Sequence, residues 1–185
     1  MKGAVKGALV ASIAVAAIST AAAADSFTPV RLAVHITRVA RLHKPLKIKV
    51  DVGADPSVLD NATGALRIRV KLAGECGGSF SSTKGVTLLD RRLNPQPVTG
   101  RPYAASATGS GKPARYGNQT VCAFLEESGD NRMFANDTSN QVNVSRACTK
   151  AAARYDTARR RHARPAKLRS ARRAARRACG PGVPL

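Results

Sequence analysis

The strongest chemical feature of the chain is a run of cationic side chains near its C-terminal end. Between Lys150 and Leu185, twelve lysine and arginine residues accompany a single acid, Asp156. A guanidinium group offers a planar fork of N–H donors that matches the oxygens of phosphate and carboxylate groups. We therefore predict an anion-binding role for ten of these residues: Arg159, Arg160, Arg161, Arg164, Lys167, Arg169, Arg172, Arg173, Arg176 and Arg177.

The expected partner is an anionic polymer of the cell envelope or an acidic lipid surface, with extracellular nucleic acid as a further source of phosphate. Tyr155 is the one aromatic residue of this segment, so single-stranded nucleic acid finds no stacking platform there. Apart from Leu168 the run lacks long aliphatic side chains, so insertion into a membrane would be shallow. The competing interpretation is a solvated basic arm whose charge reflects only amino-acid composition.

Four cysteines, Cys76, Cys122, Cys148 and Cys179, are the other reactive side chains. An even number of cysteines in an exported chain predicts two disulfides. A metal site is disfavoured, because there is no C-x-x-C pair and the three histidines lie far from the cysteines in sequence. We expect neither a metal nor a cofactor.

No catalytic residue can be assigned from the sequence. There is no G-x-S-x-G nucleophile motif. Glu126 and Glu127 are adjacent, so on a strand they face opposite sides and cannot act as a paired acid and base. The sequence therefore favours a non-catalytic binding or structural module of the cell envelope. The alternative is a secreted enzyme or inhibitor whose site lies on loops and leaves no motif.

The first 24 residues have the pattern of a cleavable signal peptide. Lys2 and Lys6 form a positive start, residues 8–18 are apolar, and the alanines at 22–24 offer a cleavage site before Asp25. No later stretch has the length of a membrane-spanning helix. We expect the mature chain to be secreted or associated with the cell surface, without a transmembrane span.

The positional pattern of apolar residues then changes near residue 149. Before it, apolar residues alternate with polar ones at 30–36, 46–52 and 66–72, which is typical of strands with one face toward a core and charged residues toward water. Weaker strand patterns follow at 86–89, 103–108, 119–125 and 141–145. About seven strands without helical periodicity predict an antiparallel β-sandwich over residues 25–148.

Residues 149–185 are rich in alanine and arginine, both good helix formers, and predict a basic helical tail. Pro165 should end or kink a helix, and Gly180 should stop one. One continuous helix from 149 to 178 would hold its ends ~45 Å apart, whereas a disulfide needs Cα atoms within about 7 Å. Two arrangements remain open: a helical hairpin closed by Cys148–Cys179, or a single kinked helix with Cys179 free or bonded to a second molecule.

Residues 27–145 resemble small secreted immunoglobulin-like β-sandwich proteins of high-GC actinobacteria. The likeness rests on the strand pair Pro45–Val50 and Leu66–Val70, on Cys76 after the second of these, and on the late strand Thr120–Leu125. It implies an immunoglobulin-like fold, an exported protein and a bond between Cys76 and Cys122, but no activity. The chain departs from the immunoglobulin pattern in lacking tryptophan and in having Thr120 where a corner tyrosine is expected.

Overall fold

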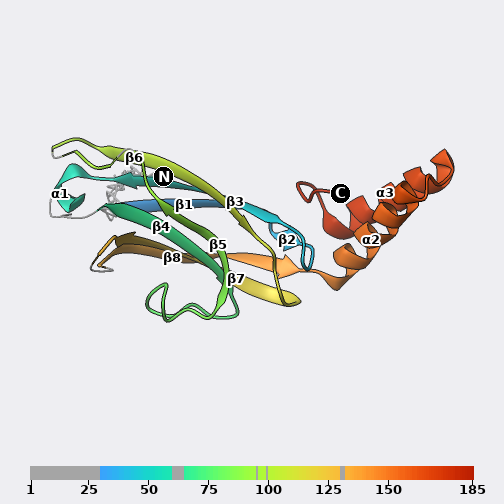
Figure 1. Cartoon of the computed structure of the whole chain (residues 1–185), viewed down its shortest axis with the longest axis horizontal. Coiled ribbons are helices and arrows are strands. Elements are labelled where there is room, and N and C mark those ends of the chain that lie inside the picture. Colours follow the sequence, from blue (N-terminus) through green and yellow to red (C-terminus); the bar gives the residue numbers. More distant parts are fainter. Residues whose placement is uncertain (1–29, 60–64, 95, 99, 130–131) are drawn as a thin grey trace, which may run out of the picture.

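The structure of the protein is a computed structural model that describes residues 30–59, 65–94, 96–98, 100–129 and 132–185. The predicted signal peptide lies outside the described residues. The described part is mainly β, with two sheets and two C-terminal helices (Figure 1). The helices project from one end of the stacked sheets.

The strands form two sheets whose order differs from their order in the chain. The smaller sheet is antiparallel and has the order β1 (Val30–Ile36), β3 (Leu46–Ala54), β6 (Tyr103–Gly111). The larger sheet has the order β2 (Val39–Ala40), β8 (Met133–Val144), β7 (Gly117–Glu127), β4 (Leu66–Ala73), β5 (Gly85–Arg92). Within it, β2 pairs with β8 in parallel and the other neighbours are antiparallel.

The core lies between the two sheets, as the alternation in the sequence predicts. Val50 of β3 and Ile68, Val70 and Leu125 of β4 and β7 are fully buried, with an exposed fraction of 0%. Their neighbours along β3, such as Lys47 and Lys49, point to solvent. The two sheets and the core between them confirm the prediction of a β-sandwich.

All seven expected strands are present, and several are longer than their patterns indicated. β8 begins at Met133, well before the predicted 141, because its first half carries few apolar residues. The sequence analysis missed two short elements, the strand β2 and the helix α1 (Pro56–Leu59). Two to four residues are too few to show a period.

The outer face of the larger sheet is covered by the loop at residues 74–84, which the sequence did not predict. Cys76 in this loop is bonded to Cys122 on β7, which confirms the pairing implied by the resemblance. Phe80 packs edge-on against Phe124 beneath the loop, with ring centroids 6.3 Å apart. Because of this cover, Cys122 and Phe124 are buried even though they face away from the main core.

This cover also corrects the expectation that the charged side chains of β4 point into water. The Arg69 guanidinium lies 3.7 Å from the Phe80 ring centroid and donates to the buried carboxylate of Glu126 at 2.9 Å. The Lys71 ammonium donates to the carbonyl oxygens of Phe80 and Thr83, each at 2.7 Å. These cations tie the loop to the sheet, because buried charge requires partners.

The two sheets meet along one side, where the edge strands β5 and β6 approach each other. A Cβ atom at Gly111 would lie 2.6 Å from the carbonyl oxygen of Thr87, and one at Gly109 would collide with the carbonyl oxygen of Leu88. Glycine is therefore required at both positions for this approach. The approach brings side chains of β3, β6 and β5 onto one continuous surface.

Candidate functional site

The cationic segment folds as two antiparallel helices, α2 (Arg146–Arg160) and α3 (Pro165–Cys179), which we call the hairpin (Figure 1). His162, with a φ of 48°, makes the turn between them, and Pro165 starts α3. Cys148 and Cys179 are bonded with Cα atoms 4.6 Å apart. The hairpin is thereby confirmed, and the single kinked helix with a free Cys179 is wrong.

Helix α2 begins at Arg146, a little earlier than the predicted boundary, and it continues directly from the sandwich. The hydroxyl oxygen of Ser145, the last residue before the helix, accepts a hydrogen bond from Cys148 N at 3.1 Å. This N-cap satisfies a donor that the helix itself leaves free. Because Ser145 follows β8 immediately, the sheet fixes the direction in which the helix leaves.

The hairpin is docked on the end of the sandwich by polar contacts from the segment after β2. Arg41 Nη2 lies 2.5 Å from Asp156 Oδ2, and only 9% of the Arg41 side chain is exposed. Leu42 N donates to Thr149 Oγ1 at 3.0 Å. A small apolar cluster containing Cys148, Ala152, Cys179 and Val183 packs beside these contacts against Val39. These contacts hold the hairpin in one orientation relative to the sheets.

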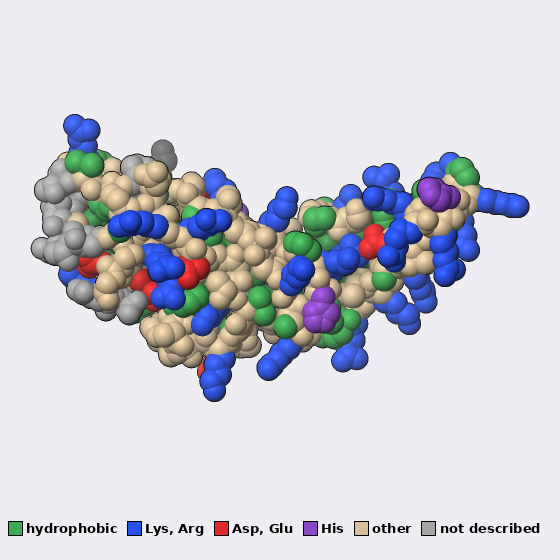
Figure 2. All heavy atoms as spheres, in the orientation of Figure 1, with side chains coloured by type: hydrophobic (Ala, Val, Ile, Leu, Met, Phe, Trp, Pro, Cys, Tyr) green, Lys and Arg blue, Asp and Glu red, His purple; other side chains and the backbone are tan. Residues whose placement is uncertain are grey.

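All ten predicted anion-binding residues lie on the hairpin or its turn, and all ten are exposed. Figure 2 shows lysine and arginine side chains projecting from the hairpin on several sides. Asp156, the only acid of the segment, is paired with Arg41. Its carboxylate therefore compensates a cation of the sandwich and leaves the ten exposed cations without an acidic partner among the described residues.

A groove of about 770 Å³ runs between the two helices. Alanines from both helices form its floor: Ala151, Ala153, Ala158, Ala163, Ala171 and Ala174. Four cations, Lys150, Arg154, Arg161 and Lys167, stand along it with the hydroxyl-bearing Thr157 and Ser170. Small floor residues leave room for close approach, and ammonium and guanidinium groups of this kind can pair with phosphate or carboxylate oxygens.

Of the ten predicted residues, only Arg161 and Lys167 line this groove. The other eight lie elsewhere on the hairpin, so the structure does not gather the predicted set into one pocket. Lys150 and Arg154 were missed because they precede the dense run of arginines. Their spacing of four residues, with Arg161 two further turns on, was the available signal, since such positions share a helix face.

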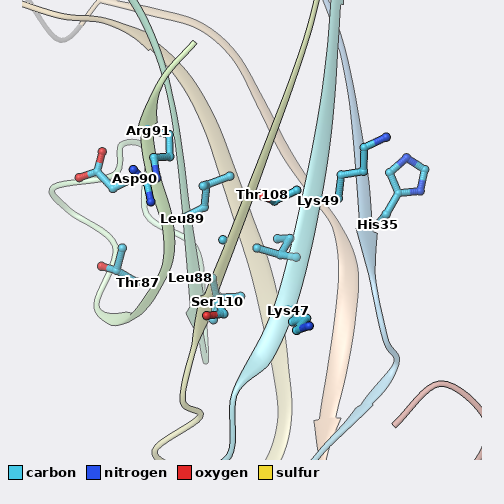
Figure 3. A pocket seen from close by; sticks show the side chains of 12 residues that line it. His35, Lys47, Lys49, Thr87, Leu88, Leu89, Asp90, Arg91, Thr108 and Ser110 are labelled. Carbon is cyan, nitrogen blue, oxygen red and sulfur yellow. The ribbon is translucent and has the colours of Figure 1, made fainter. Parts of the chain in front are cut away.

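A second hollow, which we call the trough, lies on the sandwich and has a volume of about 890 Å³. Figure 3 shows His35, Lys47 and Lys49 on one side of it, with Asp90 and Arg91 on the other. The short side chains of β6 lie between, with Gly109 leaving the surface open at the point where β5 approaches. The sequence did not predict this surface, because it depends on the meeting of two sheet edges.

Acids near the trough are already engaged. Lys49 Nζ lies 2.9 Å from Asp51 Oδ1, and His35 Nε2 lies 2.9 Å from Asp51 Oδ2. Hydrogen bonds from Lys49 and then from the Ser106 hydroxyl lower the pKa of Asp51 to about 2. Asp90 is bound by Arg67 and Arg69. Lys47 and Arg91 have no acidic partner in the described part of the chain, so they carry the uncompensated charge of the trough.

Two further properties bear on the class of site. Within the described ranges, no group of three or more His, Cys, Asp and Glu side chains is placed to hold a metal ion. Among the helices in those ranges, none combines the length and the apolar character needed to cross a bilayer. Comparison with protein-family models and with curated proteins finds no match to this chain.

Proposed function

We propose that the protein is an exported, non-catalytic binding module whose hairpin binds anionic polymers or surfaces of the cell envelope. Export is supported by the signal-peptide pattern and by the two disulfides, because such bonds persist in oxidising compartments. The observation that carries the binding proposal is the combination of ten exposed cations with one acid that is paired to the sandwich. The site thus keeps its full positive charge.

We further propose that the sandwich is immunoglobulin-like. Its strand order supports this, because β1, β3 and β6 follow the order of strands A, B and E, and β8, β7 and β4 follow that of G, F and C. Strand β5 then takes the position of an added strand beside C. The Cys76–Cys122 bond lies within the larger sheet and its loop, unlike the bond between sheets found in antibody domains.

A flexible polymer suits the hairpin better than a planar membrane does. A flat surface can meet the cations of one side only, whereas a chain can follow the groove and wrap around the helices. Interfacial helices also need an exposed apolar face. The exposed large apolar residues of the described chain, Val98, Tyr116 and Met133, all belong to the sandwich.

Bound polyanion would also relieve repulsion within α3. Three like-charged pairs lie four residues apart on this helix: Arg169 and Arg173, Arg172 and Arg176, and Arg173 and Arg177. Each such pair disfavours an isolated helix by about 0.2–0.5 kcal/mol. Phosphate groups placed between the guanidinium groups screen this repulsion and accept charge-assisted hydrogen bonds from them.

The test is a comparison of two full-length variants with the same loss of charge. The hairpin variant changes the groove cations Lys150, Arg154, Arg161 and Lys167 to glutamine. The control variant changes four exposed sandwich cations, Arg31, Lys84, Arg92 and Arg101, to glutamine. Affinities for inorganic polyphosphate and for vesicles containing acidic lipid are measured at one fixed salt concentration.

The proposal predicts that the hairpin variant loses on the order of 500-fold in affinity for polyphosphate, because each of the four lost phosphate contacts costs about fivefold at moderate salt. The control variant should lose far less. Equal losses in the two variants would mean that binding depends only on net charge, and would overturn the hairpin as the site. Tighter binding to vesicles than to polyphosphate would replace the polymer by a membrane as the partner.

A further inference from the structure

Three hollows adjoin one another between the face of the sandwich and the hairpin. The first is the trough. The second, of about 380 Å³, lies between residues 37–47 and the C-terminal residues 182–185. The third, of about 340 Å³, lies where Arg41 and Lys44 meet the last turn of α2. Lys47 lines the first and the second, and Arg41 and Lys44 line the second and the third, so each hollow borders the next.

The cations along these hollows form one series, which we call the cationic track. It comprises Arg91, Lys47, Lys44, Arg160 and Arg159, all of them exposed. The two acidic side chains that line the hollows are paired, Asp90 with Arg67 and Asp156 with Arg41. Positive charge along the track is therefore not neutralised by the side chains that line it.

The track crosses the junction between the sandwich and the hairpin. Fixed contacts at this junction hold the two parts of the track in one relative position. Val183 is 4% exposed, and its carbonyl oxygen accepts from Arg176 Nη1 at 3.2 Å. Arg41 Nη1 donates to the carbonyl oxygen of Pro184 at 3.4 Å. The C-terminal segment is thus held against both helix and sandwich. Arg161, which follows Arg160 directly, lines the groove of the hairpin on another face of α2, because consecutive helical residues do not share a face. A chain that leaves the track therefore reaches the groove by passing around α2.

The lining of the track points to phosphate groups and to no stacking partner. Thr87, Thr108 and Ser110 add hydroxyl donors beside the cations of the trough. Neither the three hollows nor the groove is lined by Phe, Tyr or Trp. Nucleobases usually stack on aromatic side chains, so a polymer recognised here is recognised through its charged backbone.

We propose that a single linear phosphodiester polymer without nucleobases, such as a polyol phosphate, lies along the cationic track and continues into the groove of the hairpin. This inference rests on the proposed function and extends its site onto the sandwich. A continuous series of adjoining hollows suits a chain, whereas a small anion would use only one of them. The sandwich then contributes binding energy in addition to holding the hairpin.

The experiment uses full-length protein and inorganic polyphosphate of two lengths. The groove is about 15 Å long at ~1.5 Å per helical residue. The short chain is no longer than the groove, whereas the long chain can occupy the groove and the track together. The track variant carries Lys44→Gln, Lys47→Gln and Arg91→Gln. Its control carries Arg31→Gln, Arg92→Gln and Arg101→Gln, which change the charge equally at exposed positions that line none of the three hollows.

The track variant should bind the long chain on the order of 100-fold more weakly, from about fivefold per lost phosphate contact at moderate salt. Its affinity for the short chain should match that of the control. Acylation of lysines supplies a second readout in the unmodified protein: the long chain should protect Lys44 and Lys47 and leave Lys84 reactive.

Equal affinities of track variant and control for the long chain, together with unprotected Lys44 and Lys47, would overturn the track. The hairpin would then remain the site if its own variant still binds weakly, so the two proposals fail separately. Equal weakening for short and long chains would also overturn the continuous path. Tighter binding of single-stranded DNA than of polyphosphate of equal charge would overturn the proposed polymer and show that the partner is a nucleic acid.

Discussion

Arg41 and Asp156 are 115 residues apart in the chain and form the ion pair that joins the hairpin to the sandwich, with Nη2 and Oδ2 at 2.5 Å. The pair combines a buried guanidinium with a carboxylate whose side chain is 29% exposed. It uses the only acid of the cationic segment. One contact therefore both orients the hairpin and leaves its exposed cations uncompensated.

The first prediction concerns this pair. Asp156→Asn should lower the free energy of unfolding by about 1–3 kcal/mol, which is less than for a fully buried pair because Asp156 is partly solvated. Urea denaturation measures the loss. Hydrogen exchange should increase at Leu42 and at the start of α2. Glu75→Gln, at an exposed residue that forms no ion pair with the described residues, removes the same charge as a control, and an equal loss there would contradict the assignment.

A second prediction concerns the Cys148–Cys179 bond, which closes a separation of 31 residues. In the chain-entropy model its removal should cost about 3.5–4 kcal/mol of stability. Like-charged pairs on α3 add to the effect, so the double Cys→Ala variant should lose helical circular dichroism as well. Added polyphosphate should restore part of that signal. Unchanged helicity without the bond would show that docking alone maintains the hairpin.

The third prediction tests the close approach of β5 and β6. Gly109→Ala places a methyl group against the Leu88 carbonyl, and should destabilise the protein by about 1–3 kcal/mol. Gly74→Ala and Gly78→Ala are matched controls, since no atom lies within 4 Å of a Cβ at either position. Thermal unfolding of the three variants measures the effect, and the transition temperature should fall for Gly109→Ala alone. Similar transitions for all three would mean that the two edges do not approach as closely as described.

The fourth prediction concerns pH. The pKa of Asp51 is about 2 in the folded chain, below the ordinary 3.8, because Lys49 and then Ser106 bind its carboxylate. Its contribution to stability is therefore fully present above about pH 4 and is lost as the pH falls through 3.8 toward 2. A carboxyl NMR titration measures the value. Lys49→Gln should move the pKa toward 3.8 and Lys47→Gln should not; no movement in either would contradict the cause.

The sandwich could be predicted from the sequence because apolar and charged residues alternate at 46–51 and 66–72, which lie in β3 and β4. Pro165 between two cysteines that a straight helix would keep apart predicted the hairpin as one of two open arrangements, and only the Cys148–Cys179 bond in the structure decides between them. The docking contact was not predictable, because Arg41 and Asp156 have no local signal for their pairing. The trough and the cationic track also depend on which sheet edges and loops meet, and this is decided by packing.

The most direct test of the central proposal is the salt dependence of polyphosphate binding by the unmodified protein and by the hairpin variant with Lys150, Arg154, Arg161 and Lys167 changed to glutamine. Each phosphate contact contributes about 0.7 to the slope of log affinity against log salt for a single-stranded polymer. The slope should therefore fall by about 3 in the hairpin variant and by much less in the charge-matched sandwich variant. Equal slopes for all three proteins would contradict the hairpin as the polyanion-binding site.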